Sequence, residues 1–283
     1  MKCFARIVFL ALAGSSASCT SPTARLEPKV QEFKAKYPGH IQSYAGVHRQ
    51  MGYAWSGNPL AQAVVFVHGS PGQWSGWVEF LLDEDLQKNF HLIAVDRPGY
   101  GGSGAGQTET SLRHQAEDVA ALLQMNHSGK PAILVGHSYG GAVIAQMAAD
   151  QPSKISNLVF VASSVDPALE KTKWYQYPAS WWPFRALIPG ALRVCNEEIM
   201  ALKPELLLLQ PRWKEISAGV SSLQGTGDDL VPAANQVFIL DHIPKAQIQV
   251  VERVVDMNHF VPWEHPVLIK NTLLKLARLN GNL

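Results

Sequence analysis

Four short apolar runs divide the middle of the chain. They are AVVFVHG at 63–69, HLIAVDRPG at 91–99, PAILVGHS at 131–138 and NLVFVASS at 157–164. Each run is nearly continuous in Val, Ile, Leu, Ala and Phe and ends in small or turn-forming residues, so each predicts a strand buried on both faces. Such strands are typical of parallel sheets, because the crossover connections cover both faces.

Helical patterns lie between and after these runs. SLRHQAEDVAALLQM at 111–125 and GAVIAQMAAD at 141–150 repeat their apolar positions with a period of about 3.6. Further along, ISAGVSSLQG (216–225) and IQVVERV (248–254) are weaker strand candidates, and HPVLIKNTLLKLARL (265–279) has a helical stripe. The alternation predicts an α/β domain with a mostly parallel sheet and helices on both faces.

Residues 167–215 interrupt this alternation. They contain KWYQYPASWWPF at 173–184 and the Leu-rich MALKPELLLLQ at 200–210, but no Val/Ile strand. We expect a helical lid inserted on the sheet. Its aromatic side chains either line an apolar substrate pocket or pack the lid onto the body.

The sharpest chemical signal is VGHSYGGA at 135–142, a G-x-S-x-G motif placed after an apolar strand and before a helical run. The turn in such a motif is tight, and Gly136 and Gly140 avoid the collision that a Cβ would cause there. Ser138 is then held at the carboxyl edge of the sheet and at a helix N-terminus, whose partial positive charge favours negative charge nearby.

Five segments in this order resemble the α/β-hydrolase superfamily, in its serine-nucleophile esterase and lipase-like branch, over nearly all of residues 45–283. They are HGSPG (68–72), DRPGYGGSG (96–104), GHSYGG (136–141), GTGDDLVP (225–232) and NHFVPWEHP (258–266). In that superfamily the chain order is nucleophile, acid, base. The resemblance implies Ser138 as nucleophile, Asp228 as acid and His259 as base.

These residue types suit the chemistry of acyl transfer. A serine hydroxyl is a weak nucleophile near neutral pH, so a neutral imidazole must take its proton and later return it to the leaving group. A carboxylate fixes the imidazole tautomer. The oxyanion needs backbone N–H donors, which the resemblance places at Ser70 and Tyr139.

The neighbouring polar residues have structural interpretations. We expect His68 to shape the oxyanion loop rather than to act as the base, and His137 to point away from the nucleophile. Asp96 and Arg97 are expected to hold together the turn after their strand. Gly99, Gly101 and Gly102 are expected to supply its unusual backbone angles.

The acid and the base each have neighbours of the same type. Relatives commonly read G-x-x-D followed three residues later by Val and then Pro, which favours Asp228, with Asp229 and Asp166 as alternatives. The preceding VSSLQ is more polar than the corresponding strand of relatives. His259 occupies the expected loop position, whereas His265 stands before Pro266 and is expected to begin the last helix.

The expected activity is hydrolysis of a carboxylic ester or a similar small apolar acyl substrate. Epoxide hydrolases and haloalkane dehalogenases have similar loops but use an aspartate nucleophile, so Ser138 argues against both. Amide or peptide hydrolysis, carbon–carbon bond hydrolysis, perhydrolysis and non-catalytic ligand binding on the same fold stay open. No metal or dinucleotide motif stands in context, so no metal and no cofactor is expected.

Charge and the N-terminal segment bear on location. With 24 basic and 23 acidic residues and no long single-sign run, no nucleic-acid partner is expected. Residues 1–18 have the layout of a secretory signal, and SASC resembles a lipoprotein signal with lipid on Cys19. We therefore expect an exported bacterial protein of the cell envelope, with a linker at 19–42 and the hydrolase domain at 43–283. Either a lipid on Cys19 attaches it to the membrane or ordinary cleavage follows Ser18, because Ser16 stands where the lipoprotein motif usually has Leu. A Cys19–Cys195 disulfide is conceivable if Cys19 stays free.

Overall fold

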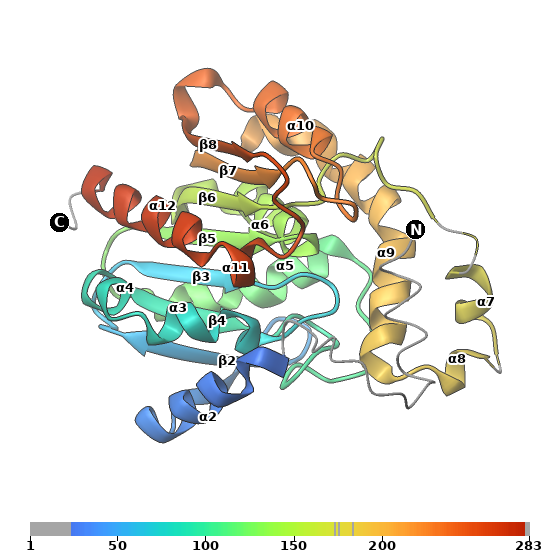
Figure 1. The fold of residues 1–283 in the computed structure, drawn as a ribbon, viewed down its shortest axis with the longest axis horizontal. Coiled ribbons are helices and arrows are strands. Elements are labelled where there is room, and N and C mark those ends of the chain that lie inside the picture. Colours follow the sequence, from blue (N-terminus) through green and yellow to red (C-terminus); the bar gives the residue numbers. More distant parts are fainter. Residues whose placement is uncertain (1–23, 173, 175, 183, 281–283) are drawn as a thin grey trace.

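An eight-stranded sheet runs through the middle of the molecule (Figure 1), and the computed structural model describes residues 24–280 except 173, 175 and 183. Its strand order is β1-β2-β4-β3-β5-β6-β7-β8. The six strands from β3 to β8 pair in parallel, whereas β1 and β2 pair antiparallel at one edge. The strands are β1 Ile41–Ala45, β2 Gln50–Gly57, β3 Ala63–Val67, β4 His91–Val95, β5 Ala132–His137, β6 Ile155–Val161, β7 Gly219–Gly225 and β8 Ile248–Val254.

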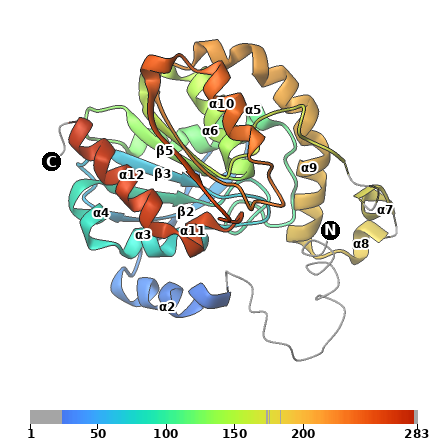
Figure 2. The ribbon, with the colours of Figure 1, turned by 45° about the horizontal axis from the view of Figure 1, so that its top comes forward.

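Alternate residues of the central strands enter two separate cores. On β3, Val65 and Val67 pack on one side, while Val64 and Phe66 pack on the other. The first core is covered by α5, α6, α9 and α10, and the second by α2, α3, α4, α11 and α12 (Figure 2). The mostly parallel sheet with helices on both faces is therefore confirmed. The helices other than those between β6 and β7 are α2 Glu27–Lys36, α3 Val78–Leu82, α4 Glu84–Asn89, α5 Leu112–Ala120, α6 Tyr139–Asp150, α10 Ala234–His242, α11 Val261–Glu264 and α12 Pro266–Leu279.

The predicted linker is wrong where the structure describes it. Residues 24–26 form the 3-10 helix η1, residues 27–36 form α2, and β1 begins at Ile41. Phe33 is completely buried, and its ring centroid lies 5.5 Å from that of Trp74. The sequence did not reveal this packing because two buried residues, Val30 and Phe33, stand among charged ones. The folded domain therefore begins well before residue 43.

The predicted signal at 1–18 and the predicted lipid site at Cys19 lie outside the described residues. Export and lipidation stay predictions from the sequence. Among the residues that the structure does describe, no helix is both long and apolar enough to cross a membrane.

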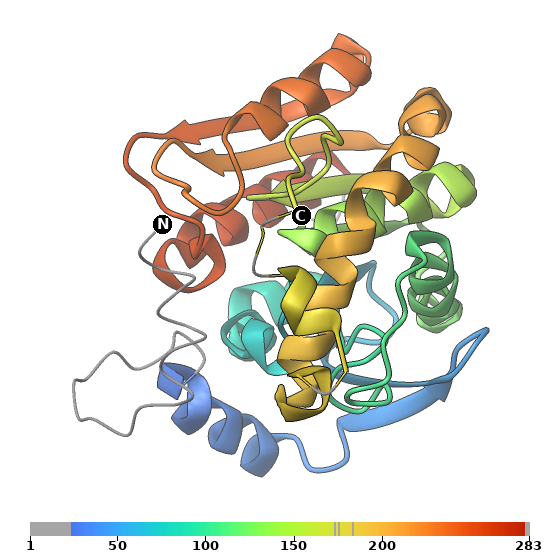
Figure 3. The same ribbon diagram turned by 90° about the vertical axis from the view of Figure 1, so that its right-hand side faces the viewer.

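The chain between β6 and β7 forms the predicted helical insertion, with α7 Gln176–Ser180, α8 Phe184–Leu187, α9 Gly190–Leu209 and the 3-10 helix η5 Gln210–Glu215. One stripe of α9 is buried, at positions 194, 195, 198, 202, 206 and 209. Figure 3 shows α9 crossing the body of the molecule, with α7 and α8 on its outer side. The insertion is thus joined to the body mainly through α9.

The described aromatic side chains at 174–182 take neither predicted role, whereas Trp213 of η5 is buried and stacks on Phe160 of β6. Trp174, Trp181 and Trp182 are 80%, 68% and 82% exposed, and Tyr177 is 52% exposed. They neither line a closed apolar pocket nor pack the insertion onto the sheet. Leu202, Leu206 and Leu209 of α9 make that packing instead, together with Trp213.

Candidate active site

Ser138 lies in a strained turn between β5 and α6. Its φ of 54° and ψ of −122° are outside the regions that L-residues ordinarily occupy. A Cβ on Gly136 would lie 2.5 Å from the carbonyl oxygen of Gly140, and one on Gly140 would lie 2.3 Å from that of Val67. The predicted steric need for glycine on both sides of Ser138 is therefore confirmed.

The structure brings His259 and Asp228 together. The His259 Nδ1 atom lies 2.8 Å from Asp228 Oδ2, and both side chains are buried. The other carboxylate oxygen, Oδ1, accepts the backbone N–H groups of Leu230 at 2.9 Å and Val231 at 2.8 Å. Burial alone would raise the pKa of Asp228, but the His259 contact and the two N–H donors outweigh it and hold the pKa below its usual value. The carboxyl group is therefore ionised near neutral pH.

The two alternative acids lie elsewhere. Asp229 is exposed to solvent. Asp166 accepts the backbone N–H of Ala168 at 2.8 Å, and its own N–H donates to Asn235. Of the three candidate carboxylates, the geometry selects Asp228 as the partner of His259.

Two polar residues of β7, Ser222 and Gln224, find buried partners, whereas the buried Ser221 hydroxyl has no hydrogen-bond partner among the described residues. Gln224 donates through Nε2 to Asp228 Oδ2 at 3.3 Å and to the Val231 carbonyl at 3.3 Å. Gln236 of α10 donates to the carbonyl oxygen of Ser222 at 3.2 Å. The polar strand therefore supports the loop that carries the acid.

His137 has a role that the sequence did not indicate. Its Nε2–H donates to the carbonyl oxygen of His259 at 3.0 Å, and the two ring centroids lie 4.8 Å apart. Burial, together with the neighbouring His259, lowers the pKa of His137 to about 3, so it stays a neutral donor. Because His137 immediately precedes Ser138, this bond ties the loop of the candidate base to the nucleophile turn.

The candidate oxyanion loop approaches Ser138 closely. A Cβ on Gly69 would lie 2.9 Å from the Ser138 Cβ, so only glycine permits this distance. Ser70 follows Gly69 directly. Tyr139 is the first residue of α6, and its backbone N–H therefore has no helical carbonyl to bind. Ser70 therefore follows the residue that approaches Ser138, and Tyr139 directly follows Ser138 in the chain.

Arg97 holds the candidate oxyanion loop in place through the backbone carbonyl groups of that loop. The buried guanidinium donates to the carbonyl oxygens of His68 at 2.8 Å and Gly69 at 2.9 Å. His68 Nε2 accepts the backbone N–H of Arg97 at 2.9 Å, and its Nδ1 donates to the Gly69 carbonyl. Both ring nitrogens of His68 are occupied by backbone groups, which agrees with the structural role expected for it.

Asp96 holds the turn after β4, as predicted. Its carboxylate accepts the backbone N–H groups of Trp74 and Gly102, each at 2.7 Å. Burial raises the pKa of Asp96 to about 6 against the opposing effect of these donors. Gly99 and Gly101 have positive φ angles of 88° and 45°, as expected, but the expectation was wrong for Gly102, whose φ is not positive. A Cβ there would instead lie 3.1 Å from the Cα of Gly52.

Glu198 of α9 is the principal residue that sequence reasoning missed. Its completely buried carboxylate pairs with Arg97, with Nη1 and Oε1 2.7 Å apart. Its Oε2 accepts the hydroxyls of Ser70 at 2.7 Å and Tyr100 at 2.8 Å. Its only sequence signal is its place in the buried stripe of α9, four residues from both Val194 and Leu202. Glu198 therefore attaches the insertion to the candidate oxyanion loop.

Removing this carboxylate is expected to destabilise the fold strongly. Glu198→Ala leaves the Arg97 guanidinium buried without its counter-charge, which costs about 3–5 kcal/mol of the free energy of unfolding. A matched control is Glu197→Ala, which breaks an ion pair with the half-exposed Arg185 and should cost less than about 1 kcal/mol. Urea unfolding of the three proteins measures both values. Equal losses for the two variants would contradict the assignment.

Cys195 is a free thiol buried on the same helix. Burial raises its pKa to about 12, so the thiol stays protonated and unreactive. A disulfide with Cys19 would require this thiol to leave its buried position, and Cys19 itself lies outside the described residues.

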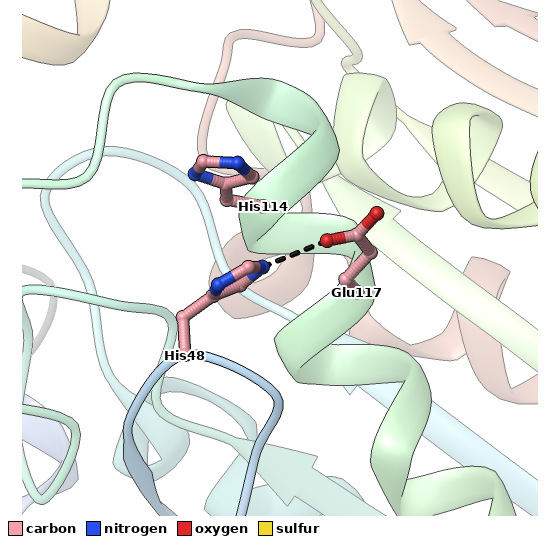
Figure 4. Close-up of side chains that lie close together, drawn as sticks. All are labelled: His48, His114 and Glu117. Carbon is pink, nitrogen blue, oxygen red and sulfur yellow. Dashed lines mark hydrogen bonds and ion pairs between the residues drawn. The ribbon is translucent and has the colours of Figure 1, made fainter.

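One group of side chains could offer three ligands to a metal ion. His48, from the loop between β1 and β2, meets His114 and Glu117 of α5 (Figure 4). His48 Nε2 already lies 2.7 Å from Glu117 Oε2, and His114 Nδ1 lies 3.3 Å from a carboxylate oxygen of Glu109. None of these residues contacts Ser138, Asp228 or His259, so this surface cluster is separate from the candidate active site.

Comparison with known proteins supports the fold. A family model described as the alpha/beta hydrolase fold matches residues 62–187. The chain is 29% identical over 148 residues to a pimeloyl-[acyl-carrier protein] methyl ester esterase of Vibrio parahaemolyticus, covering 52% of this chain and 50% of that protein. It is 27% identical over 281 residues to epoxide hydrolase 1 of Caenorhabditis elegans, covering 92% of this chain and 65% of that protein.

The similarity to solved structures extends over nearly the whole chain. A membrane phospholipase A, described as a bacterial virulence factor, is 20% identical and superposes with a TM-score of 0.65, covering 98% of this chain and 99% of that one. By contrast, the chain spans between 26% and 65% of the length of the first curated relatives that it matches. These comparisons establish the alpha/beta hydrolase fold.

Proposed function

We propose that the chain is a serine hydrolase of the alpha/beta hydrolase superfamily and that it cleaves a carboxylic ester or a similar acyl substrate, a proposal that the matching fold supports. The observation that carries this proposal is the buried His259–Asp228 pair, whose loop is bonded to His137 beside the strained turn of Ser138. A structural histidine would not need an ionised, N–H-supported carboxylate behind its Nδ1 atom.

The geometry suits nucleophilic catalysis. The Ser138 hydroxyl attacks the substrate carbonyl while His259 Nε2 takes the proton, because the bond from Nδ1–H to Asp228 leaves Nε2 as the basic nitrogen. His259 then returns the proton to the leaving alcohol, and the acyl group stays on Ser138. A water molecule, activated by the same imidazole, hydrolyses this acyl-enzyme.

Negative charge on the substrate oxygen requires fixed donors. The backbone N–H groups of Ser70 and Tyr139 are proposed for this role, and each such donor contributes on the order of 10²–10³ to the rate. Arg97 and Glu198 hold the Ser70 loop through its carbonyls and its hydroxyl. The donors are therefore positioned before substrate arrives, and their reorganisation costs little.

The residue at the nucleophile position favours acyl transfer over epoxide opening. One relative is named an epoxide hydrolase, a class whose nucleophile is an aspartate that forms an alkyl ester. This chain has Ser138 at that position. A second relative is named a methyl ester esterase, whose reaction agrees with a serine nucleophile.

Burst kinetics with p-nitrophenyl acetate test the proposal. We expect a rapid release of about one equivalent of nitrophenol per protein, followed by slower turnover, because the acyl-enzyme forms faster than it is hydrolysed. The matched anilide should react more slowly, since its amine leaves less readily. An absence of both burst and turnover with acetyl, butyryl and octanoyl esters would count against the proposal.

A further inference from the structure

The insertion exposes a concentration of large apolar side chains. We define the aromatic patch as Trp174, Tyr177, Trp181, Trp182 and Leu187, which belong to α7, α8 and the chain beside them. Leu187 is 80% exposed, comparable with the tryptophans. Tryptophan is usually well buried in a folded protein, and large exposed apolar side chains gathered on one segment are typical of an interaction site.

The arrangement of the insertion turns this patch outward. The helix α9 gives its buried stripe to the body, and α7 packs on the other side of α9. In Figures 1 and 2, α7 and α8 project from the molecule beyond α9. These side chains therefore lie outside both buried cores and present their apolar surface to solvent.

The charge of the same segment narrows the choice of partner. Residues 171–193 contain Lys171, Lys173, Arg185 and Arg193 and no Asp or Glu. Arg185 pairs with Glu197 but stays half-exposed, and Lys171 is exposed. The segment is cationic as well as aromatic. A symmetric contact between two copies would bring two such cationic segments face to face, which disfavours a second copy of the chain as partner.

We propose that the aromatic patch docks on the surface of an anionic phospholipid bilayer. Tryptophan and tyrosine favour the headgroup region, where the ring is partly buried and its N–H or O–H stays hydrated. Lysine and arginine beside them are attracted to anionic lipids. Docking of this kind turns the α9 side of the molecule toward the membrane. The proposal goes beyond the hydrolase function and does not depend on it.

Vesicle binding by the full chain carrying Cys19→Ser tests the proposal, since no lipid can then be attached at that position. The vesicles contain either phosphatidylglycerol with phosphatidylethanolamine or phosphatidylcholine alone. We expect sedimentation with the anionic vesicles and a blue shift of tryptophan emission. Combined Trp174→Ala, Trp181→Ala and Trp182→Ala substitutions should weaken the partition coefficient at least about tenfold. Ser138→Ala in the Cys19→Ser chain, with the tryptophans kept, should leave the partition coefficient unchanged. This result would separate docking from catalysis.

The control replaces apolar side chains that are equally exposed elsewhere. Val47, Leu60 and Val255 are 64%, 69% and 74% exposed, and their combined change to Ala should not alter binding. Equal binding of the triple-tryptophan variant and the control would overturn the proposal. Equal binding of the Cys19→Ser chain to both kinds of vesicle would contradict the proposed preference for an anionic surface. If the protein does not bind vesicles, and sedimentation velocity shows dimers that the triple-tryptophan substitution abolishes, the patch is a contact between two copies of the chain and the proposal is wrong.

Discussion

Asp228→Asn is expected to lower kcat for aryl ester hydrolysis by about 10⁴. The backbone N–H groups of Leu230 and Val231 require an oxygen at the Oδ1 position, so the new amide must turn its NH₂ group toward His259. An NH₂ group can only donate, which forces His259 Nδ1 to accept and places the imidazole proton on Nε2. The ring can then no longer take a proton from Ser138.

Asp229→Asn is the matched control for this prediction. Asp229 is the next residue along the same loop, but its side chain is exposed. We expect its kcat and KM to stay within about twofold of wild type, since surface substitutions of this kind have small effects. Steady-state kinetics of both variants provide the comparison. A larger loss for Asp229→Asn than for Asp228→Asn would move the acid to the exposed position.

The central part of the fold could be predicted because its strands are buried on both faces. Continuous apolar runs of this type need no alternation to be recognised, and four of them correspond to β3, β4, β5 and β6. The predicted runs extend beyond the observed strands at their polar ends, because Gly69 and Ser138 belong to the turns that follow β3 and β5. The β1–β2 hairpin was missed because IQSYA and QMGYAWSG mix polar residues with glycine at an antiparallel edge.

The candidate triad was predicted from motifs in a fixed order along the chain, whereas its supporting residues were not. Glu198 and His137 act through contacts across 101 and 122 residues of sequence, which no local pattern reveals. The exposed tryptophans were misread for a related reason. The density of aromatic residues in a sequence does not show whether their side chains face the core or the solvent. In this structure the buried stripe of α9 packs on the body, and the tryptophans at 174, 181 and 182 are left exposed.

Ser138→Ala is expected to reduce kcat for ester hydrolysis by about 10⁶, the largest loss for any single substitution in this chain. The remaining donors and the imidazole cannot form an acyl-enzyme without the hydroxyl, although they can still stabilise direct attack by water. The variant should fold normally, since alanine occupies less space than serine. Its circular dichroism and urea midpoint, compared with wild type, check that the loss is chemical. Retention of more than about one tenth of the wild-type rate would contradict the assignment.

The most direct measurement is the reaction of the purified protein with a fluorophosphonate, followed by peptide mass spectrometry. Such a probe forms a stable bond only with a serine whose hydroxyl is activated by a neighbouring base. We expect one adduct per molecule, on Ser138, that is lost in Ser138→Ala and formed far more slowly in Asp228→Asn. No adduct on the wild-type protein, or an adduct on a different serine, would contradict it.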